Sequence, residues 1–286
     1  MIFLLNTWQF NVVLYLFCIV SFFQFYKLAV QHTKNEGAAT LVLQLIAGFS
    51  ILPFIPFFPF QVPTEPRVWL MLIIAAVFYA IVDRLGTTTR KHLEVSIMSI
   101  LAQMGNVFLI IYGFTLFKEP IILTKVLGAF LILFGNIFLQ FKKGAFEINK
   151  YVILSVIASL AYATAISIDI GTSVSFNLPF YIFFTFFIPA IILYFWERTS
   201  VGAIVNEFQT GEKKYFLLTG ITWSLAVLFT LRALQLGKVS EVIPLEASAV
   251  ILNVIVASII LKERSDLTKK IIAAILVIAG IVLTVQ

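Results

Sequence analysis

Four charged residues stand inside apolar stretches of the sequence, where a charge is costly. They are Asp83, Arg84, Arg232 and Glu246. A charged side chain near the centre of a lipid bilayer costs at least ~2.5–3.5 kcal/mol on insertion scales, so it usually faces the interior of a helix bundle and has a partner or a task. These four residues are therefore the first candidates for binding a substrate or a coupling ion.

Arg232 and Glu246 flank a short connection. Arg232 lies five residues before Gly237 and Glu246 nine residues after it, so on two helices both reach a similar depth, roughly 7–10 Å below the turn. The spacing predicts that they pair across a helical hairpin. A permanent ion pair would lock the two helices together. A switchable pair would let Glu246 take a proton, or Arg232 bind a substrate carboxylate or phosphate. Both alternatives stay open.

Asp83 and Arg84 are neighbours in the sequence. On a helix they point about 100° apart and cannot satisfy each other on one face. At least one of them is expected to face a cavity or a partner helix. Two other charges, Lys27 and Asp169, fall at the ends of apolar runs, and we interpret them as interfacial.

Amide side chains form a second group of candidates. Gln103 and Asn106 are three residues apart and share a helix face, and Asn253 lies seven residues beyond Glu246, on the same face. Taken singly, such amides are explained by hydrogen bonds between helices, which are worth only ~0.6–2 kcal/mol.

Tyr79 and Trp223 could supply aromatic walls to the same region, although ordinary packing explains each of them alone. The amides and aromatic residues fall on the same four apolar segments as the charges. This grouping favours a central pathway through the protein.

The sequence contains no pattern for catalysis or metal binding. His32 and His92 are expected in loops, and Cys18 is the single cysteine, so no His/Cys metal site can form. No nucleophile–base pair, P-loop or dinucleotide-binding fingerprint is present. We expect no enzyme activity, no metal, no cofactor and no ATP-driven pumping by this chain alone.

The composition indicates that the chain lies in a lipid bilayer rather than in water. Of 286 residues, 61% are hydrophobic and 12% charged, with a mean hydropathy of +1.04. Soluble domains are about half apolar and a quarter charged, so the chain is an integral membrane protein whose partner is the lipid bilayer. A soluble enzyme, a secreted disulfide scaffold, a nucleic-acid-binding module and a disordered chain are excluded. The net charge of +6 comes from basic residues that punctuate the apolar runs, as loop charges do.

Charge-free runs locate the membrane spans. They cover residues 1–26, 37–64, 68–82, 95–117, 126–141, 151–168, 170–196, 215–231, 247–261 and 271–286. Since about 20 helical residues cross the hydrocarbon, ten runs predict an all-α protein with ten transmembrane helices. The first is expected to be a retained helix, because it lacks a basic start. Four prolines between positions 53 and 63 predict that the second helix ends near Phe54.

The chain also repeats itself. Residues 95–142 align with residues 239–286 at a constant offset of 144, so that Val95-Ser96 meets Val239-Ser240 and Lys118-Glu119 meets Lys262-Glu263. Ten helices then form two halves of five, 1–144 and 145–286. Because five is odd, the second half enters the membrane from the opposite side. Such inverted repeats are typical of transporters whose substrate site lies between the halves.

Two sequence strings carry a family resemblance. They are P-L-E-A-S-A-V-I-L-N-V-I-V-A-S-I-I-L-K-E-R-S-D-L-T-K-K from Pro244, and L-F-K-E-P-I-I-L-T-K-V-L-G-A-F from Leu116. Both resemble the repeat ends of EamA-type transporters in the drug/metabolite transporter superfamily. The first half departs from the pattern, with Ile100 in place of a proline. The resemblance implies export of small metabolites, amino acids or toxic compounds, often by ion or metabolite exchange.

Membrane orientation stays open. Fourteen basic residues fall in loops on one side, Arg90 among them, and four on the other. The positive-inside rule would place both termini outside, whereas the resemblance implies cytoplasmic termini.

We therefore expect a multi-pass secondary transporter of the cell membrane that exports a small molecule by alternating access. Proton coupling and exchange are both open, as are the substrate, the direction and the oligomeric state. A membrane scaffold that keeps the transporter fold is the main alternative, and a passive channel is a weaker one.

Overall fold

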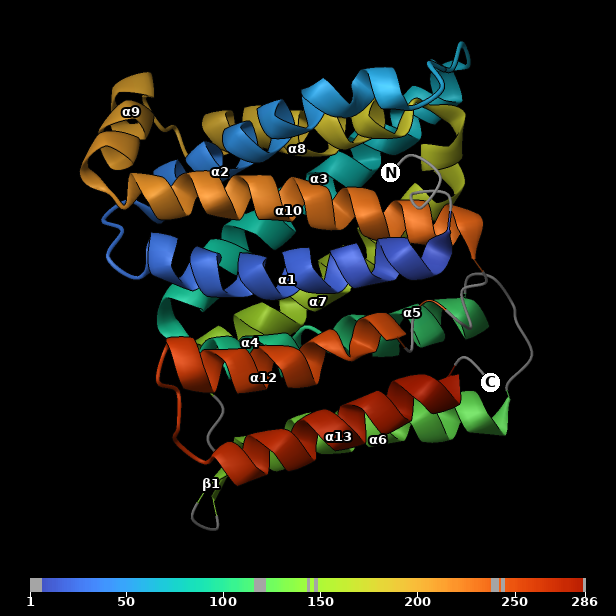
Figure 1. Ribbon diagram of the computed structural model, residues 1–286, viewed down its shortest axis with the longest axis vertical. Coiled ribbons are helices and arrows are strands. Elements are labelled where there is room, and N and C mark those ends of the chain that lie inside the picture. The colour runs from blue at the N-terminus through green and yellow to red at the C-terminus, as the bar shows by residue number, and fades with distance from the viewer. Residues whose placement is uncertain are drawn as a thin grey trace.

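The computed structural model describes residues 7–115, 122–142, 145–146, 149–237, 242 and 245–284. It is a bundle of helices that run side by side (Figure 1). Within the described residues, eight helices are long and apolar enough to cross a membrane, and Leu123–Leu139 and Leu245–Ile260 are shorter apolar helices. The chain is a multi-pass membrane protein.

The first half contains α1 (Trp8–Val30), α2 (Glu36–Ile51), the 3₁₀ helix η2 (Leu52–Phe57), α3 (Pro66–His92), α4 (Val95–Leu101), α5 (Met104–Thr115) and α6 (Leu123–Gln140). Two short strands, β1 (Phe141–Lys142) and β2 (Ala145–Phe146), pair after α6. The second half contains α7 (Lys150–Thr172), the 3₁₀ helix η3 (Ser173–Ser175), α8 (Leu178–Trp196), α9 (Val201–Thr210), α10 (Lys213–Leu236), α12 (Ala249–Ile260) and α13 (Leu267–Thr284).

Short polar residues begin several of these helices. The side-chain oxygens of Asn35, Asn149, Asn177 and Ser200 accept hydrogen bonds from backbone N–H groups in the first turns of α2, α7, α8 and α9. These caps satisfy donors that have no partner inside the helix. They explain where these helices start.

Two helices continue past the charges at which their charge-free runs end. α3 runs on from Val82 to His92, so the expectation that Arg90 and His92 lie in loops is wrong. α7 passes through Asp169 to Thr172, so Asp169 lies within a helix. A charge does not end a helix when partners inside the bundle satisfy it.

Other boundaries also differ from the expected ones. The fourth apolar run is broken at Ala102 and Gln103 into α4 and α5, and α9 fills the long connection between α8 and α10. α2 ends at Ile51 and continues as 3₁₀ helix to Phe57, because the prolines there cannot donate to an α-helical ladder. Pro244, Glu119 and the tight connection at 238–240 lie outside the described residues.

The helices pack in matched sets. α1 lies along α10, as α3 lies along α7. α2 contacts α10, as α3 contacts α8. Other contacts also join the halves, among them those of α2 with α8, α4 with α12, and α6 with α13. If the offset of 144 relates α1 to α7, α2 to α8 and α3 to α10, the contact of α1 with α10 corresponds to that of α3 with α7, and the contact of α2 with α10 to that of α3 with α8.

α6 and α13 touch through their backbones. A Cβ atom at Gly128 would lie 2.5 Å from the carbonyl oxygen of Gly280, and one at Gly135 would lie 3.1 Å from that of Ala273. Residue numbers rise along α6 as they fall along α13, so the pair is antiparallel. Small residues permit this approach, as in other membrane helix pairs. The two helices lie together at one edge of the bundle (Figure 1).

Candidate functional site

A cavity of about 300 Å³ lies in the interior of the bundle. Its walls come from α1, α3, α4, α5 and from α7, α8, α10 and α12, so both halves of the chain contribute. Four ionisable groups line it beside its tyrosines: Asp83, Arg90, Asp169 and Glu246. Small-molecule sites are concave and mostly apolar, with a few polar groups that fix orientation. This cavity has that character.

Seven of the nine residues named from the sequence line the cavity, and Arg84 and Arg232 do not. The seven are Tyr79, Asp83, Gln103, Asn106, Trp223, Glu246 and Asn253. They come from sequence positions up to 174 residues apart, from Tyr79 to Asn253, and meet because α3, α5, α10 and α12 surround one space. Their role in binding stays a prediction.

Glu246 is buried at the end of the cavity near the start of α12. Thr230 Oγ1 donates to Glu246 Oε2 at 2.9 Å. The other oxygen, Oε1, is buried and has no hydrogen-bond partner within the described residues. Tyr15 of α1 and Tyr162 of α7 also line the cavity, close enough to Glu246 for electrostatic interaction. The carboxyl group therefore keeps one oxygen available for a proton or a ligand.

Arg232 does not pair with Glu246, so the pairing expected across the hairpin is wrong. The guanidinium lies 5.7 Å from the ring centre of Phe58 and donates to Gln235 at 3.5 Å. Helix geometry explains this result. Thr230 faces Glu246, and a residue two positions further is turned by about 200°, which carries Arg232 to the opposite face of α10.

Asp83 and Asp169 are buried carboxylates with neutral partners. Gln44 donates to Asp83 at 2.8 Å. The hydroxyl groups of Tyr79 and Tyr181 each donate to Asp169 at 2.5 Å. Buried carboxylates need such donors because they have lost their hydration. Asp169 was interpreted as interfacial from the sequence, and its place inside α7, facing these tyrosines, corrects that interpretation.

The amides and Trp223 complete the lining. Asn106 donates to Gln103 at 2.9 Å, as their shared helix face predicts. Gln24 of α1 donates to Asn253 at 3.3 Å. The Trp223 ring lies 5.3 Å from Phe22, 5.9 Å from Tyr26 and 4.9 Å from Phe186 between ring centres. One wall of the cavity is thus a cluster of aromatic rings.

Sequence reasoning missed Arg90, which lines the cavity two turns beyond Asp83 on the same face of α3. Its guanidinium carbon lies 5.3, 5.3 and 4.6 Å from the ring centres of Phe22, Phe23 and Tyr26. The spacing of seven residues from Asp83 was the available signal. It was lost because Arg90 was counted among loop charges.

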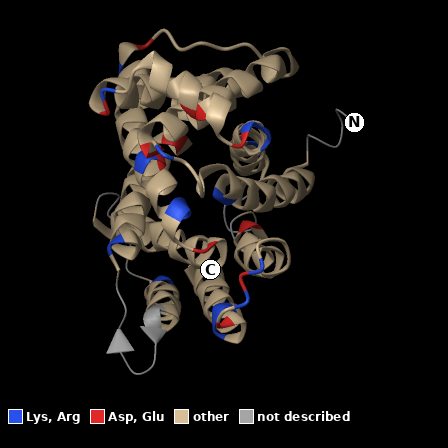
Figure 2. Cartoon of the chain, turned by 90° about the vertical axis from the view of Figure 1, so that its left-hand side faces the viewer, with Lys and Arg blue, Asp and Glu red and all other residues tan. Residues whose placement is uncertain are grey.

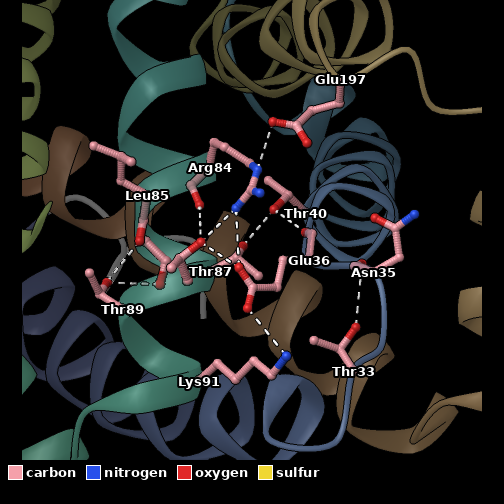
Figure 3. A network of polar contacts seen from close by, with 12 residues as sticks. Thr33, Asn35, Glu36, Thr40, Arg84, Leu85, Thr87, Thr89, Lys91 and Glu197 are labelled. Carbon is pink, nitrogen blue, oxygen red and sulfur yellow. Dashed lines mark hydrogen bonds and ion pairs between the residues drawn. The ribbon is translucent and has the colours of Figure 1, made fainter. Parts of the chain in front are cut away.

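Arg84 belongs to a polar network at the end of the bundle where α1, α3 and α8 finish and α2 begins, which we call the Glu36 end (Figure 3). Arg84 Nε donates to Glu197 Oε1 at 2.8 Å, and Arg84 Nη1 lies 3.4 Å from Glu36 Oε2. Lys91 Nζ lies 3.2 Å from Glu36 Oε1. Arg84 therefore holds α2, α3 and α8 together and faces away from the cavity.

Further contacts tie the α3–α4 connection at the Glu36 end to other helices. Lys27 donates to the carbonyl oxygens of Lys91 and Leu93 at 3.0 and 2.9 Å. Lys270 of α13, which is buried, forms an ion pair with Glu94. Viewed at 90° to Figure 1, most of the ribbon carries no charge and the charged positions gather in a few groups (Figure 2).

Glu263 caps a helix of the other half. Its carboxylate accepts hydrogen bonds from the backbone N–H groups of Val95 and Ser96 at 2.8 and 3.0 Å, and from Ser96 Oγ at 2.7 Å. The group it caps, the start of α4, lies 167 residues away in the sequence.

We expect Glu263→Ala to destabilise the protein by about 1–3 kcal/mol, because two backbone donors at the start of α4 lose a charged acceptor. The measurement is the midpoint of unfolding in detergent. Glu212→Ala is the matched control, since Glu212 is exposed and makes no side-chain cap. Equal midpoints for the two variants would contradict the capping role.

Two comparisons with known proteins bear on this site. Residues 149–286 match the EamA-like transporter family, so the resemblance expected from the sequence is confirmed for the second half of the chain. A protein of known crystal structure superposes with a TM-score of 0.58 at 12% identity, covering 95% of this chain and 96% of that one. That likeness shows a shared fold along the whole chain. No curated protein matches the sequence.

Proposed function

We propose that this chain, with its EamA-like second half, is a secondary transporter that carries a small polar or amphipathic molecule across the cell membrane. The observation that carries the proposal is the interior cavity, lined by both halves and by four ionisable groups within an apolar bundle. Buried charges are costly and mark substrate or ion pathways. An anchor or scaffold has no need of them.

The proposed mechanism is alternating access of two inverted five-helix repeats, residues 1–144 and 145–286. The matched helix contacts support it, because the pairs α1–α10 and α2–α10 correspond to α3–α7 and α3–α8 when the halves are exchanged. The antiparallel contact of α6 with α13 is also what two oppositely oriented repeats require. In such proteins one half rocks against the other around a site at their boundary.

Glu246 is the proposed coupling residue, with Asp83, Asp169 and Arg90 as substrate or ion partners. The unpartnered Oε1 atom of Glu246 supports this role. Arg232 and Arg84, which are bound elsewhere, are not proposed as substrate residues. We propose export as the direction, with proton coupling or exchange as the energy source.

The scaffold alternative predicts that every polar side chain in the interior is held in a static pair. Glu246 Oε1 and the Arg90 Nε atom, both buried without a hydrogen-bond partner within the described residues, favour transport instead.

The proposal is tested by comparing the metabolites released from cells that express the wild type and cells that express Glu246→Gln. A compound enriched outside only with the wild type names the substrate class and supports export. Equal release, with both proteins correctly inserted, contradicts export and leaves import or a structural role.

A further inference from the structure

We propose that Arg90 binds an anionic group of the transported molecule, which is then a small organic acid with an aromatic or apolar body. This inference rests on the proposed transport function and names the substrate class for the same cavity. Three observations support it. Aromatic rings surround the Arg90 guanidinium, no described residue accepts a hydrogen bond from it, and aromatic side chains form the cavity wall beside it.

The guanidinium of Arg90 is held by aromatic rings. Phe22, Phe23 and Tyr26, all on α1, place their ring centres 5.3, 5.3 and 4.6 Å from its central carbon. Cation–π attraction stabilises the charge without using its N–H groups as hydrogen-bond donors. No described residue uses the N–H donors of this guanidinium in a hydrogen bond.

Arg90 makes no ion pair and no hydrogen bond with any described residue, and its Nε atom is buried without a partner. Other cations of the same region are paired: Arg84 with Glu36 and Glu197, and Lys270 with Glu94. Unlike Arg84 and Lys270, Arg90 has aromatic rings rather than a carboxylate in direct contact with its guanidinium.

None of the cavity carboxylates forms a close ion pair with Arg90. Asp83, the nearest along α3, interacts with Arg90 electrostatically across two helix turns, and its carboxylate accepts a hydrogen bond from Gln44. Asp169 is bound by Tyr79, and Tyr79 lies eleven residues before Arg90 on α3, a rise of about 16 Å. A molecule whose opposite charges are one or two bonds apart cannot bridge that distance. A zwitterion of this kind that is bound at Arg90 therefore cannot also reach Asp169.

Gly86 makes room for this arrangement. It also lines the cavity, one turn before Arg90, and a Cβ atom at position 86 would lie 2.6 Å from Arg90 Nη1. The guanidinium therefore folds back over a glycine. Alanine at this position would displace the end of a flexible side chain and no backbone atom.

The rest of the pocket fits an apolar body. Trp223, Phe22 and Phe186 form an aromatic wall beside Arg90. The volume of about 300 Å³ stands at the lower limit of the ~300–1,000 Å³ typical of small-molecule sites. Arginine forms two parallel hydrogen bonds equally well with a carboxylate or a phosphate, so the experiment has to separate these two head groups.

The test is binding of four probes that share a phenyl ring: benzoate, phenyl phosphate, benzyl alcohol and benzylammonium. Affinity for purified wild-type protein in lipid nanodiscs is measured by calorimetry. We expect benzoate or phenyl phosphate to bind at least about tenfold more tightly than the neutral and cationic probes, or about 1.4 kcal/mol. Whichever acid binds better identifies the head group. Equal affinity for all four probes, or no binding by any, overturns the proposal.

Variants test the residue itself. Arg90→Gln and Gly86→Ala are each expected to remove at least about tenfold of the affinity for the acid, the second by displacing the guanidinium from its rings. Arg232→Gln is the matched control, because Arg232 does not line the cavity. Loss of affinity in the control to the same extent, or retention in Arg90→Gln, overturns the assignment. The wild-type comparison still decides the question if a variant fails to fold.

Flux into proteoliposomes separates this inference from the transport function. Movement of benzyl alcohol or benzylammonium, with no binding of either acid, overturns the anion site and leaves transport intact. Binding of an acid that depends on Arg90, with no flux of any probe, supports the anion site and contradicts transport.

Discussion

Glu246→Gln abolishes the dependence of transport on a proton gradient and leaves the fold intact, if Glu246 couples transport to protons. The buried Glu246 carboxyl has one oxygen bound to Thr230 and the other without a partner in the described chain. Glutamine keeps the acceptor for Thr230 and cannot release a proton. A gradient of ~1 pH unit supplies about 1.4 kcal/mol per proton, which supports about tenfold accumulation. The variant is expected to accumulate nothing above equilibrium.

The measurement is accumulation of the substrate in proteoliposomes with and without a pH gradient. Glu212→Gln is the matched control, because Glu212 is exposed at the start of α10. It should keep the full gradient effect. A pH dependence in Glu246→Gln that equals the wild type would remove Glu246 from the mechanism.

Gly128→Val should separate α6 from α13 and lower stability by about 1–3 kcal/mol or more, since overpacking at a rigid contact cannot be relieved by rotating a side chain. The new Cβ atom would lie 2.5 Å from the carbonyl oxygen of Gly280 and 3.0 Å from the backbone nitrogen of Thr284. Backbone atoms have to move. The measurement is the thermal midpoint of the purified protein in detergent, together with transport.

Gly171→Val provides the comparison. Gly171 lies near the end of α7, and a Cβ atom there would meet nothing within 4 Å. The same substitution should change the midpoint little at that position. If both variants unfold at the same temperature, the close approach of α6 and α13 does not contribute to stability.

Much of the architecture could be predicted from the sequence, because membrane spans follow from length and apolarity alone. The rule that located them, absence of charge, also caused the errors. It ended the third charge-free run at Val82, and Arg90 was counted among the loop charges, although α3 continues to His92. It read Asp169 as a helix end for the same reason. Charges inside a membrane protein are the residues that such a rule misplaces.

Partners across the bundle were harder to predict. Tyr181 and Tyr79 bind Asp169, and Glu263 caps Val95. Nothing in the local sequence specifies these contacts, because they depend on how helices distant in sequence pack. The Arg232–Glu246 pair was plausible by depth, but depth ignores the rotation of a helix about its axis. Which side chains meet depends on the helix face that each occupies as well as on its depth in the membrane.

At the proposed repeat offset of 144, the four charged residues of the cavity have no charged counterparts. Arg90 and Asp83 correspond to Leu234 and Val227, and Asp169 and Glu246 correspond to Phe25 and Ala102. This proposed alignment therefore pairs each charged residue of the cavity with an apolar residue of the other half.

The two halves are alike in scaffold and unlike in chemistry. The only lining guanidinium in the described residues comes from the first half, while Asp169 and Glu246 come from the second. Asp83 also comes from the first half, so that half contributes one cationic and one acidic side chain, whereas the second half contributes two acidic ones. In the proposed transport cycle the two halves therefore present different charges to the substrate.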